Sequence, residues 1–194
     1  VLDASEMAGI GEVVERHGAR VFSDEIHAPL IYPGRRHVPY ASVDEVTAGH
    51  TLTATSASKA WNLPGLKAAQ VVVSNAADRT RWEAEGMMWG HGAANLGVIA
   101  NTAAYTGGGP WLDGVVGYLD DSRRLLADLV AEHLPGVRYS TPEGTYLAWL
   151  ECADLGLPQP AAEFFGERAG VALTDGGMCG EVGAGAVRLN FAMP

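Results

Sequence analysis

The chain has 194 residues, of which 47% are hydrophobic, and it carries a formal net charge of -10 at pH 7. This apolar content can bury a substantial core and indicates a globular chain of one or two domains. The 13 lysine and arginine residues are too few for the basic face that a nucleic-acid backbone demands, and no run approaches the roughly 18 to 20 apolar residues of a membrane span. Neither nucleic acid nor a membrane is therefore expected as a partner.

The chain contains two cysteines, Cys152 and Cys179. Two thiols make neither a disulfide framework nor a four-ligand metal site, so no metal is expected and a reduced cytoplasmic setting fits best. The first residues lack a basic region followed by an apolar stretch, so no secretion signal is predicted.

Residues 1–107 are predicted to form an α/β unit. The expected elements are helices at 5–17 (capped by Ser5), 43–48, 75–88 and 96–105, and strands at 19–23, 51–55 and 68–74. Helical crossover material separates the first two strands, so these strands are expected to be parallel. Asp24 follows the first of them and Lys59 lies just past the second, so both side chains can face one pocket.

Residues 108–194 are predicted to form a smaller α+β unit. The run Gly107-Gly108-Gly109-Pro110 marks the clearest boundary in the chain, and Pro110 suits the first turn of a helix at 111–133. Beyond Pro135-Gly136 the pattern predicts strands at 145–150, 171–174 and 187–191 and a helix at 161–169.

Lys59 is the central candidate for chemistry. An amine on a rigid element that faces a cavity can attack a carbonyl and form a Schiff base. Ser56, Ser58 and Lys67 can hold a phosphate beside it, which is the arrangement that pyridoxal 5'-phosphate requires. The alternatives are a solvated lysine and serines that only cap a turn.

Three further residues carry weaker signals. Asp24 can pair with a pyridine nitrogen and keep it protonated, although an aspartate after a strand also caps loops, and Glu25 beside it is expected to be solvated. His27 can hydrogen-bond a phenolic oxygen, or it is a structural histidine. Arg188 suits a substrate carboxylate, and an internal salt bridge is an equal alternative on the sequence.

Five stretches, in chain order, resemble one family. They are residues 21–27 (VFSDEIH), 55–66 (TSASKAWNLPGL), 110–113 (PWLD), 144–150 (GTYLAWL) and 187–191 (VRLNF). Together they cover nearly the whole chain and resemble the class I/II, fold-type I enzymes that depend on pyridoxal phosphate. Among these, the set is similar to the MalY/PatB type of cystathionine β-lyase. One S-x-S-K stretch would be weak evidence, whereas five in sequence are strong.

The resemblance implies a fold and a set of roles. The fold is α/β, with the remainder of a large domain built on a mostly parallel sheet (1–107) and a smaller α+β C-terminal domain (108–194). The implied roles are the Schiff-base lysine for Lys59, the pyridinium partner for Asp24, the neighbourhood of the phenolic oxygen for His27, the phosphate for Ser56 and Lys67, and the substrate carboxylate for Arg188.

The sequence also departs from the family pattern. The resemblance begins just after the family's Asn-Pro-Thr-Gly stretch and stops before its last helix, so the chain is expected to be a fragment. The glycine-rich phosphate turn, the ring-stacking aromatic residue and an asparagine of the family are then missing, and the fragment alone is expected to bind the cofactor weakly and to be inactive.

The implied activity is the C–S β-elimination of a cystathionine-like amino acid in a cytoplasmic homodimer. Transamination by a class I/II aminotransferase is the first alternative, because the same residues serve both reactions. A non-catalytic fragment of the same fold is the second. A third reading takes Ser56 as the nucleophile of the S-x-x-K motif in serine β-lactamases, but the S-D-N and K-T-G companions do not occur.

Overall fold

Two units make up the chain in the computed structural model, which describes residues 1–193. One unit spans Val1–Gly114 and the other begins at Val115. The predicted domain boundary at 107/108 falls at the junction of two helices, α6 (Asn95–Gly107) and α7 (Gly109–His133), whereas the units divide further on, inside α7.

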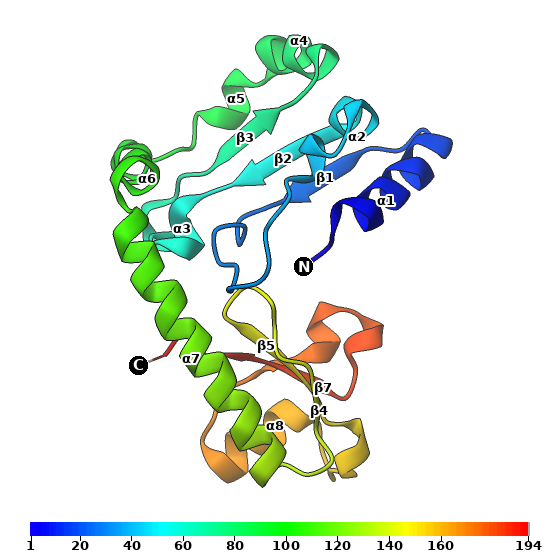
Figure 1. The fold of residues 1–194 in the computed structure, drawn as a ribbon, viewed down its shortest axis with the longest axis vertical. Coiled ribbons are helices and arrows are strands. Elements are labelled where there is room, and N and C mark those ends of the chain that lie inside the picture. Colours follow the sequence, from blue (N-terminus) through cyan, green and yellow to red (C-terminus); the bar gives the residue numbers. More distant parts are fainter. Residues whose placement is uncertain (194) are drawn as a thin grey trace. The chain divides into compact units, whose positions relative to one another are not determined.

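The first unit is built on a three-stranded sheet of order β1-β2-β3 (Figure 1). β1 (Val21–Asp24) and β2 (Thr51–Thr55) are parallel, with Asp24 opposite Ala54. β3 (Gln70–Val73) runs antiparallel to β2, a pairing that the sequence analysis did not anticipate. The short connection between β2 and β3 contains no long crossover helix, so the chain reverses direction there. The α/β fold class is confirmed.

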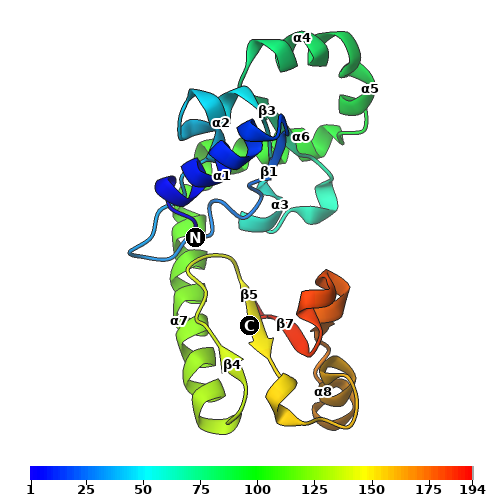
Figure 2. The same cartoon turned by 90° about the vertical axis from the view of Figure 1, so that its right-hand side faces the viewer.

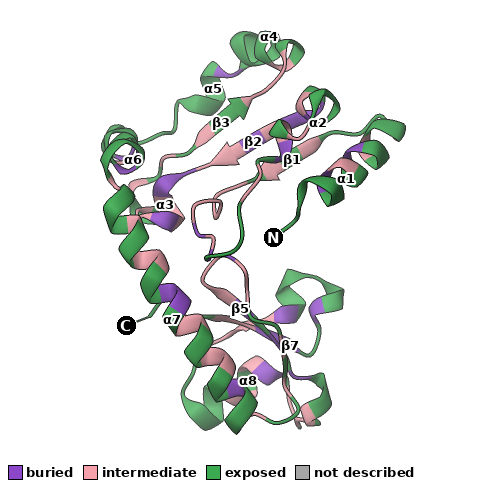
Figure 3. Ribbon diagram, viewed as in Figure 1, coloured by how far each residue is buried: buried purple, intermediate pink, exposed green. Residues whose placement is uncertain are grey.

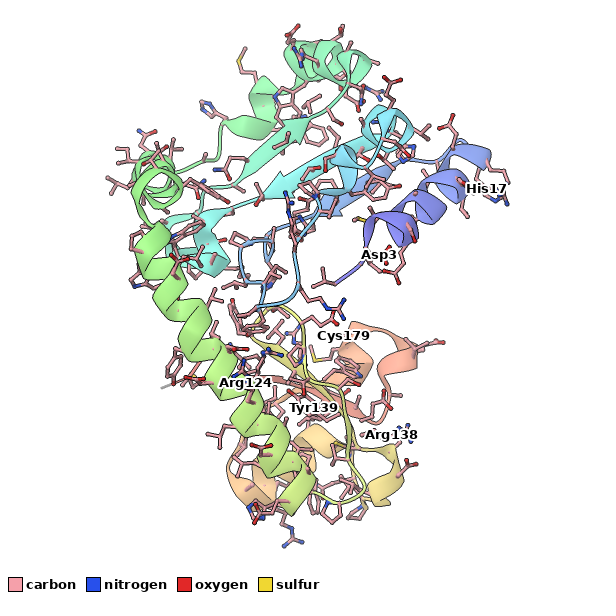
Figure 4. The ribbon with its side chains drawn as sticks, viewed as in Figure 1. Asp3, His17, Arg124, Arg138, Tyr139 and Cys179 are labelled. Carbon is pink, nitrogen blue, oxygen red and sulfur yellow. The ribbon has the colours of Figure 1, made fainter. Side chains whose placement is uncertain are left out.

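Helices connect and flank these strands. Besides α6 they are α1 (Ala4–Arg16), α2 (Glu45–Gly49), α3 (Ala57–Ala60), α4 (Ala76–Glu85) and α5 (Met87–Gly90), with 3-10 turns η1 (Tyr40–Ser42) and η2 (Pro64–Leu66). The predicted cap Ser5 is wrong: Asp3 caps α1, because its carboxylate accepts from the backbone N–H groups of Ser5 and Glu6 while the Glu6 side chain returns to the Asp3 N–H. Asp3 and His17 lie at the two ends of α1 (Figure 4).

Buried residues of this unit lie on several elements, among them α2, β2 and α3 (Figure 3), and Thr51, Ser56 and Ala57 are each at most 1% exposed. The outer strands are less covered, since Phe22 on β1 and Val72 on β3 are 67% and 51% exposed. Part of the buried core of this unit therefore lies at the segment that carries Lys59.

The second unit joins the rest of α7 to a four-stranded antiparallel sheet of order β4-β5-β7-β6 (Figure 2). Its elements are β4 (Arg138–Tyr139), β5 (Leu147–Glu151), η3 (Ala153–Leu155), α8 (Ala161–Ala169), β6 (Thr174–Asp175), η4 (Gly176–Cys179), η5 (Glu181–Gly183) and β7 (Ala186–Asn190). Val130, Leu150 and Val187 form its core together with Cys152. Burial raises the pKa of the Cys152 thiol, which keeps it protonated at neutral pH, and Cys179 is a free, exposed thiol.

No helix within residues 1–193 combines the length and the apolar content needed to cross a bilayer.

Candidate active site

Lys59 lies on the short helix α3, directly after the carboxyl end of β2. The first N–H groups of this helix are occupied: Ala57 N donates to Asn101 Oδ1 over 2.7 Å, and Ser58 N donates to the Ser56 hydroxyl over 3.0 Å. The side chain of Lys59 is half-buried, and within residues 1–193 its ammonium group has no recorded hydrogen bond or ion pair. The fold thus holds the backbone of this lysine firmly and leaves the amine available.

Helix α6 supports the lysine segment from behind. Asn101 on α6 is 6% exposed and bonds the start of α3. A Cβ atom at Gly97 of α6 would lie 2.1 Å from the carbonyl oxygen of Leu66, so the helix touches the segment's backbone at a place that only glycine allows. Trp61, two residues after Lys59, donates from Nε1 to the Gly108 carbonyl over 2.9 Å. Sequence reasoning missed Asn101, because nothing near it in the chain marks it as a partner of Ala57.

Asp24 ends β1 at the same end of the sheet. It is paired with Ala54 of the parallel strand β2, and Lys59 follows Ala54 by five residues. The Asp24 carboxylate is exposed and accepts one local hydrogen bond, from Ile26 N at 3.1 Å. The carboxyl ends of β1 and β2 therefore present a carboxylate and an amine on neighbouring elements, as the sequence predicted.

The turn after Asp24 contains Glu25 and His27. The Glu25 side chain is 10% exposed, so the expectation that it is solvated is wrong: its carboxylate accepts hydrogen bonds from Ser23, His37 and the Tyr40 backbone. His27 is half-buried, and its carbonyl accepts the N–H of Leu30. The sequence next to Glu25 does not predict these partners, because His37 and Tyr40 lie more than ten residues away along the chain.

The predicted phosphate ligands differ in their surroundings. The Ser56 hydroxyl donates a hydrogen bond to the Ala68 carbonyl over 2.6 Å, and Ser56 is 1% exposed. Within residues 1–193 the Ser58 hydroxyl has no recorded hydrogen bond. Lys67 is exposed and adopts left-handed backbone angles, with φ 51° and ψ 56°, which are uncommon for a residue with a side chain. Ser58 and Lys67 can thus donate to an anion directly, whereas Ser56 would first have to redirect its proton.

The alternative in which Ser56 is a nucleophile finds no support in this geometry. Ser56 precedes α3 as its N-cap, so Ser56 and Lys59 do not share a helix as the S-x-x-K motif requires. The hydroxyl is buried and donates to a backbone carbonyl rather than to a base.

Arg188 lies in the second unit, on β7 between Trp149 of β5 and Thr174 of β6. Its Nη2 atom donates to Thr174 Oγ1 over 3.4 Å, and none of the ion pairs recorded in residues 1–193 includes it. The internal salt bridge that the sequence left open is therefore not formed here. A half-buried guanidinium group without a carboxylate partner is suited to bind one from a ligand.

Curated relatives match almost the whole chain. A Mycobacterium tuberculosis protein named "Putative cystathionine beta-lyase" is 49% identical over 97% of this chain and 50% of its own length. Protein MalY of Escherichia coli is 34% identical over 100% of this chain and 50% of its own length. A weaker match, at 29% identity over 82% of this chain and 38% of its own length, is a "Probable N-succinyldiaminopimelate aminotransferase DapC" from M. tuberculosis. The chain spans about half the length of the curated relatives it matches most strongly.

Solved structures have the same fold. A "putative plp-dependent beta-cystathionase" from Corynebacterium diphtheriae superposes with a TM-score of 0.94 at 38% identity, covering 100% of this chain and 51% of the other. Cystalysin from Treponema denticola, whose structure contains a pyridoxal 5'-phosphate cofactor, superposes with a TM-score of 0.92 at 31% identity, covering 100% and 50%. The resemblance inferred from the five stretches is confirmed. Since the model of the family "Aminotransferase class I and II" matches residues 1–194, the chain belongs to the class I and II aminotransferase family.

Proposed function

We propose that this chain forms part of a pyridoxal phosphate-dependent C–S β-lyase that acts on cystathionine-like amino acids. One observation carries the proposal: Lys59, an amine without a partner in the part of the chain that the structure describes, follows the carboxyl end of β2, and Asp24, an exposed carboxylate, ends the parallel strand β1. Ligands bind beyond such strand ends in open α/β sheets. The relatives named as cystathionine β-lyases support the choice of chemistry, because they match more strongly than the aminotransferase does.

The residues present fit this cofactor. A carbonyl needs an amine with no competing partner, and Lys59 is such an amine in the described chain. A pyridine nitrogen that must stay protonated needs an anion, and Asp24 has its second carboxylate oxygen uncommitted. A phosphate needs hydroxyl and cationic donors. Ser58 and Lys67 have donors without a hydrogen-bond partner among the residues that the structure describes, and the Ser56 hydroxyl donates to the Ala68 carbonyl.

When bound, pyridoxal phosphate would supply an electron sink for the charge left at the substrate's α-carbon. Lys59 would hold the cofactor through its amine and, once the substrate's amine has taken that place, would accept the α-proton on Nζ. Asp24 would hold the proton at the ring nitrogen by direct charge pairing. His27 would donate to the phenolic oxygen, and Arg188 would bind the substrate carboxylate with its planar fork. Lys67 and Ser58 would keep the phosphate in place.

The overall reaction breaks the bond between the β-carbon and sulfur. The sulfur leaves as a thiol, and with one water taken up the remaining carbon skeleton becomes pyruvate and ammonia. Transamination would instead transfer the amino group to a 2-oxo acid and leave the C–S bond intact. The residues listed above serve both outcomes, so the choice depends on the leaving group and on the shape of the pocket.

The test of reaction type uses the extended protein, by which we mean this chain together with the part of its relatives' length that it does not span. Given cystathionine, and separately an amino donor with a 2-oxo acid, it should release thiol and pyruvate at least roughly tenfold faster than it transfers amino groups, a difference of about 1.4 kcal/mol in barrier. The reverse ordering would move the assignment to the aminotransferase alternative. Absence of both activities, with no cofactor absorbance after pyridoxal phosphate is added, would favour the non-catalytic fragment.

A second prediction concerns the substrate carboxylate. Arg188→Ala should raise KM for cystathionine by roughly ten- to a hundredfold, because hydrogen bonds to a charged group contribute about 1.5 to 3 kcal/mol. Arg188→Lys should recover only part of this loss, since an ammonium group lacks the bidentate fork. Steady-state kinetics of the extended protein provide the measurement, and Arg168→Ala, at an exposed position on α8, is the matched control. An unchanged KM in Arg188→Ala would remove Arg188 from the site.

The same proposal includes a cytoplasmic homodimer. Free thiols at Cys152 and Cys179 are compatible with a reducing compartment. Large apolar side chains such as Met87, Met88 and Trp89 are 84%, 82% and 75% exposed, and surfaces of this kind favour association.

A further inference from the structure

A buried carboxylate lies directly beside the Asp24 position. The Glu25 side chain is 10% exposed, and its two oxygens take three hydrogen bonds. Oε1 accepts from the Ser23 hydroxyl and from the Tyr40 backbone N–H, both over 3.0 Å, and Oε2 lies 2.9 Å from His37 Nε2. An ionised carboxylate can only accept, so this contact is a hydrogen bond in the tautomer that has its proton on His37 Nε2. A charge this deeply placed is retained only where such donors compensate its lost hydration.

These donors come from both ends of one long connection. Ser23 belongs to β1, while His37 and Tyr40 close residues 26–39, a 14-residue loop between β1 and η1. A loop of this length without helix or strand is uncommon unless it is tied down or functional. Leu30 and Tyr32, at 1% and 2% exposure, anchor its first half. Glu25 ties the returning half of the loop to the end of β1 through His37 and Tyr40.

The backbone of Glu25 is held as well. Its N–H donates to the Ala54 carbonyl over 2.8 Å, which extends the β1–β2 ladder by one residue, and its carbonyl accepts the N–H of Ala28 over 2.9 Å. In an extended chain successive side chains point to opposite faces. Because Glu25 shares its face with Ser23 and turns toward the loop, Asp24 between them must turn to the other, exposed face.

We propose that Glu25 is a positioning residue of the site. By binding Ser23, His37 and Tyr40 through one carboxylate, it sets the direction of Asp24 and the start of the turn that carries His27. This inference rests on the proposed function, since it concerns how two residues assigned to the cofactor are held. It assigns no contact between Glu25 and the cofactor or the substrate.

The first measurement is proteolysis of the loop. Arg35 and Arg36 are exposed and lie between Tyr32, which is buried, and His37, which contacts Glu25. The rate of trypsin cleavage after these two arginines therefore reports how often the second half of the loop opens. In the extended protein, Glu25→Ala should raise the rate of cleavage at these two sites roughly tenfold. Glu25→Gln keeps an oxygen for Ser23 and Tyr40, and its NH2 group can donate to His37 Nε2 once the imidazole carries its proton on Nδ1, so this variant should stay close to the wild-type rate. Glu83→Ala, at an exposed position on α4, is the control.

The second measurement is the pH dependence of the bound cofactor's visible absorbance. If loss of the Glu25 contacts lets the Asp24 side chain change direction, the negative charge near the ring nitrogen changes as well. Glu25→Ala should therefore shift the midpoint of this titration by roughly half a pH unit or more. Glu25→Gln should restore it, and Glu83→Ala should leave it in place. If Glu25→Ala does not fold, His37→Ala removes the loop donor while leaving Glu25 in place, and it should show the faster cleavage with a smaller shift in the midpoint.

Two results would overturn the inference. One is cleavage of Glu25→Ala at the wild-type rate, and the other is faster cleavage with an unmoved absorbance midpoint, which would make Glu25 a structural residue only. A wild-type extended protein that shows no cofactor absorbance would overturn the proposed function and this inference with it. Normal wild-type absorbance with unaltered variants would overturn the inference alone.

Discussion

Lys59→Ala is expected to lower the C–S lyase activity of the extended protein by at least about 10³-fold, since the variant loses both the attachment of the cofactor and the base that takes the α-proton. The physical reason lies in the fold: the amine of Lys59 has no recorded partner in residues 1–193, and its backbone is fixed by Ser56 and Asn101. Addition of a small primary amine to the variant should recover only a small part of the rate.

Chemical labelling separates this role from a general loss of structure. Lys59 and Lys67 are the only two lysines in the sequence. Borohydride reduction of the extended protein with bound cofactor, followed by peptide mapping, should place the label at Lys59 rather than at Lys67 or at a lysine outside these 194 residues, and the Lys59→Ala variant should carry none. Lys67→Ala, the matched control, should keep the label and bind the cofactor roughly tenfold more weakly, because it loses one cation near a dianion. A label on Lys67 in the wild-type protein would make both assignments wrong.

Asp24→Asn is the second change with a large expected effect. Activity should fall by about 10²-fold or more while much of the cofactor stays bound, because the neutral amide no longer favours the protonated ring nitrogen although attachment at Lys59 persists. The loss should appear in kcat rather than in KM, since Asp24 is assigned no contact with the substrate.

The measurements are the kinetics and the cofactor absorbance of the same sample. Asp121→Asn on α7, an exposed position, should match the wild-type protein in both. If Asp24→Asn retained the wild-type kcat, the ring-nitrogen partner would have to be another group. Asp24→Asn also leaves the Glu25 contacts intact, so the trypsin sites at Arg35 and Arg36 should be cleaved at the wild-type rate.

The roles that the sequence indicated belong to residues marked by their immediate neighbours. Lys59 is recognisable because a strand of five residues ends just before Ser56 and a proline and a glycine follow at Pro64-Gly65. Asp24 is recognisable in the same way, as the carboxylate that follows Val21-Phe22-Ser23 at the end of a strand. These are local patterns, and local patterns are what hydrophobic periodicity and turn residues report. The five stretches then led to the family.

Tertiary structure alone decided the partners that lie far apart in the chain. Asn101 bonds Ala57 across 44 positions, and Tyr40 bonds Glu25 across 15. Neither contact can be predicted from the residue types, because the sequence does not distinguish a buried, hydrogen-bonded asparagine or glutamate from one in solvent. The direction of β3 was likewise decided by the tertiary structure, since strand pairing depends on how the connection folds back and not on the alternation of residues within the strand. The sequence by itself therefore determined the family and the candidate residues of the site, and the packing of α6 and of the loop 26–39 decided how those residues are held.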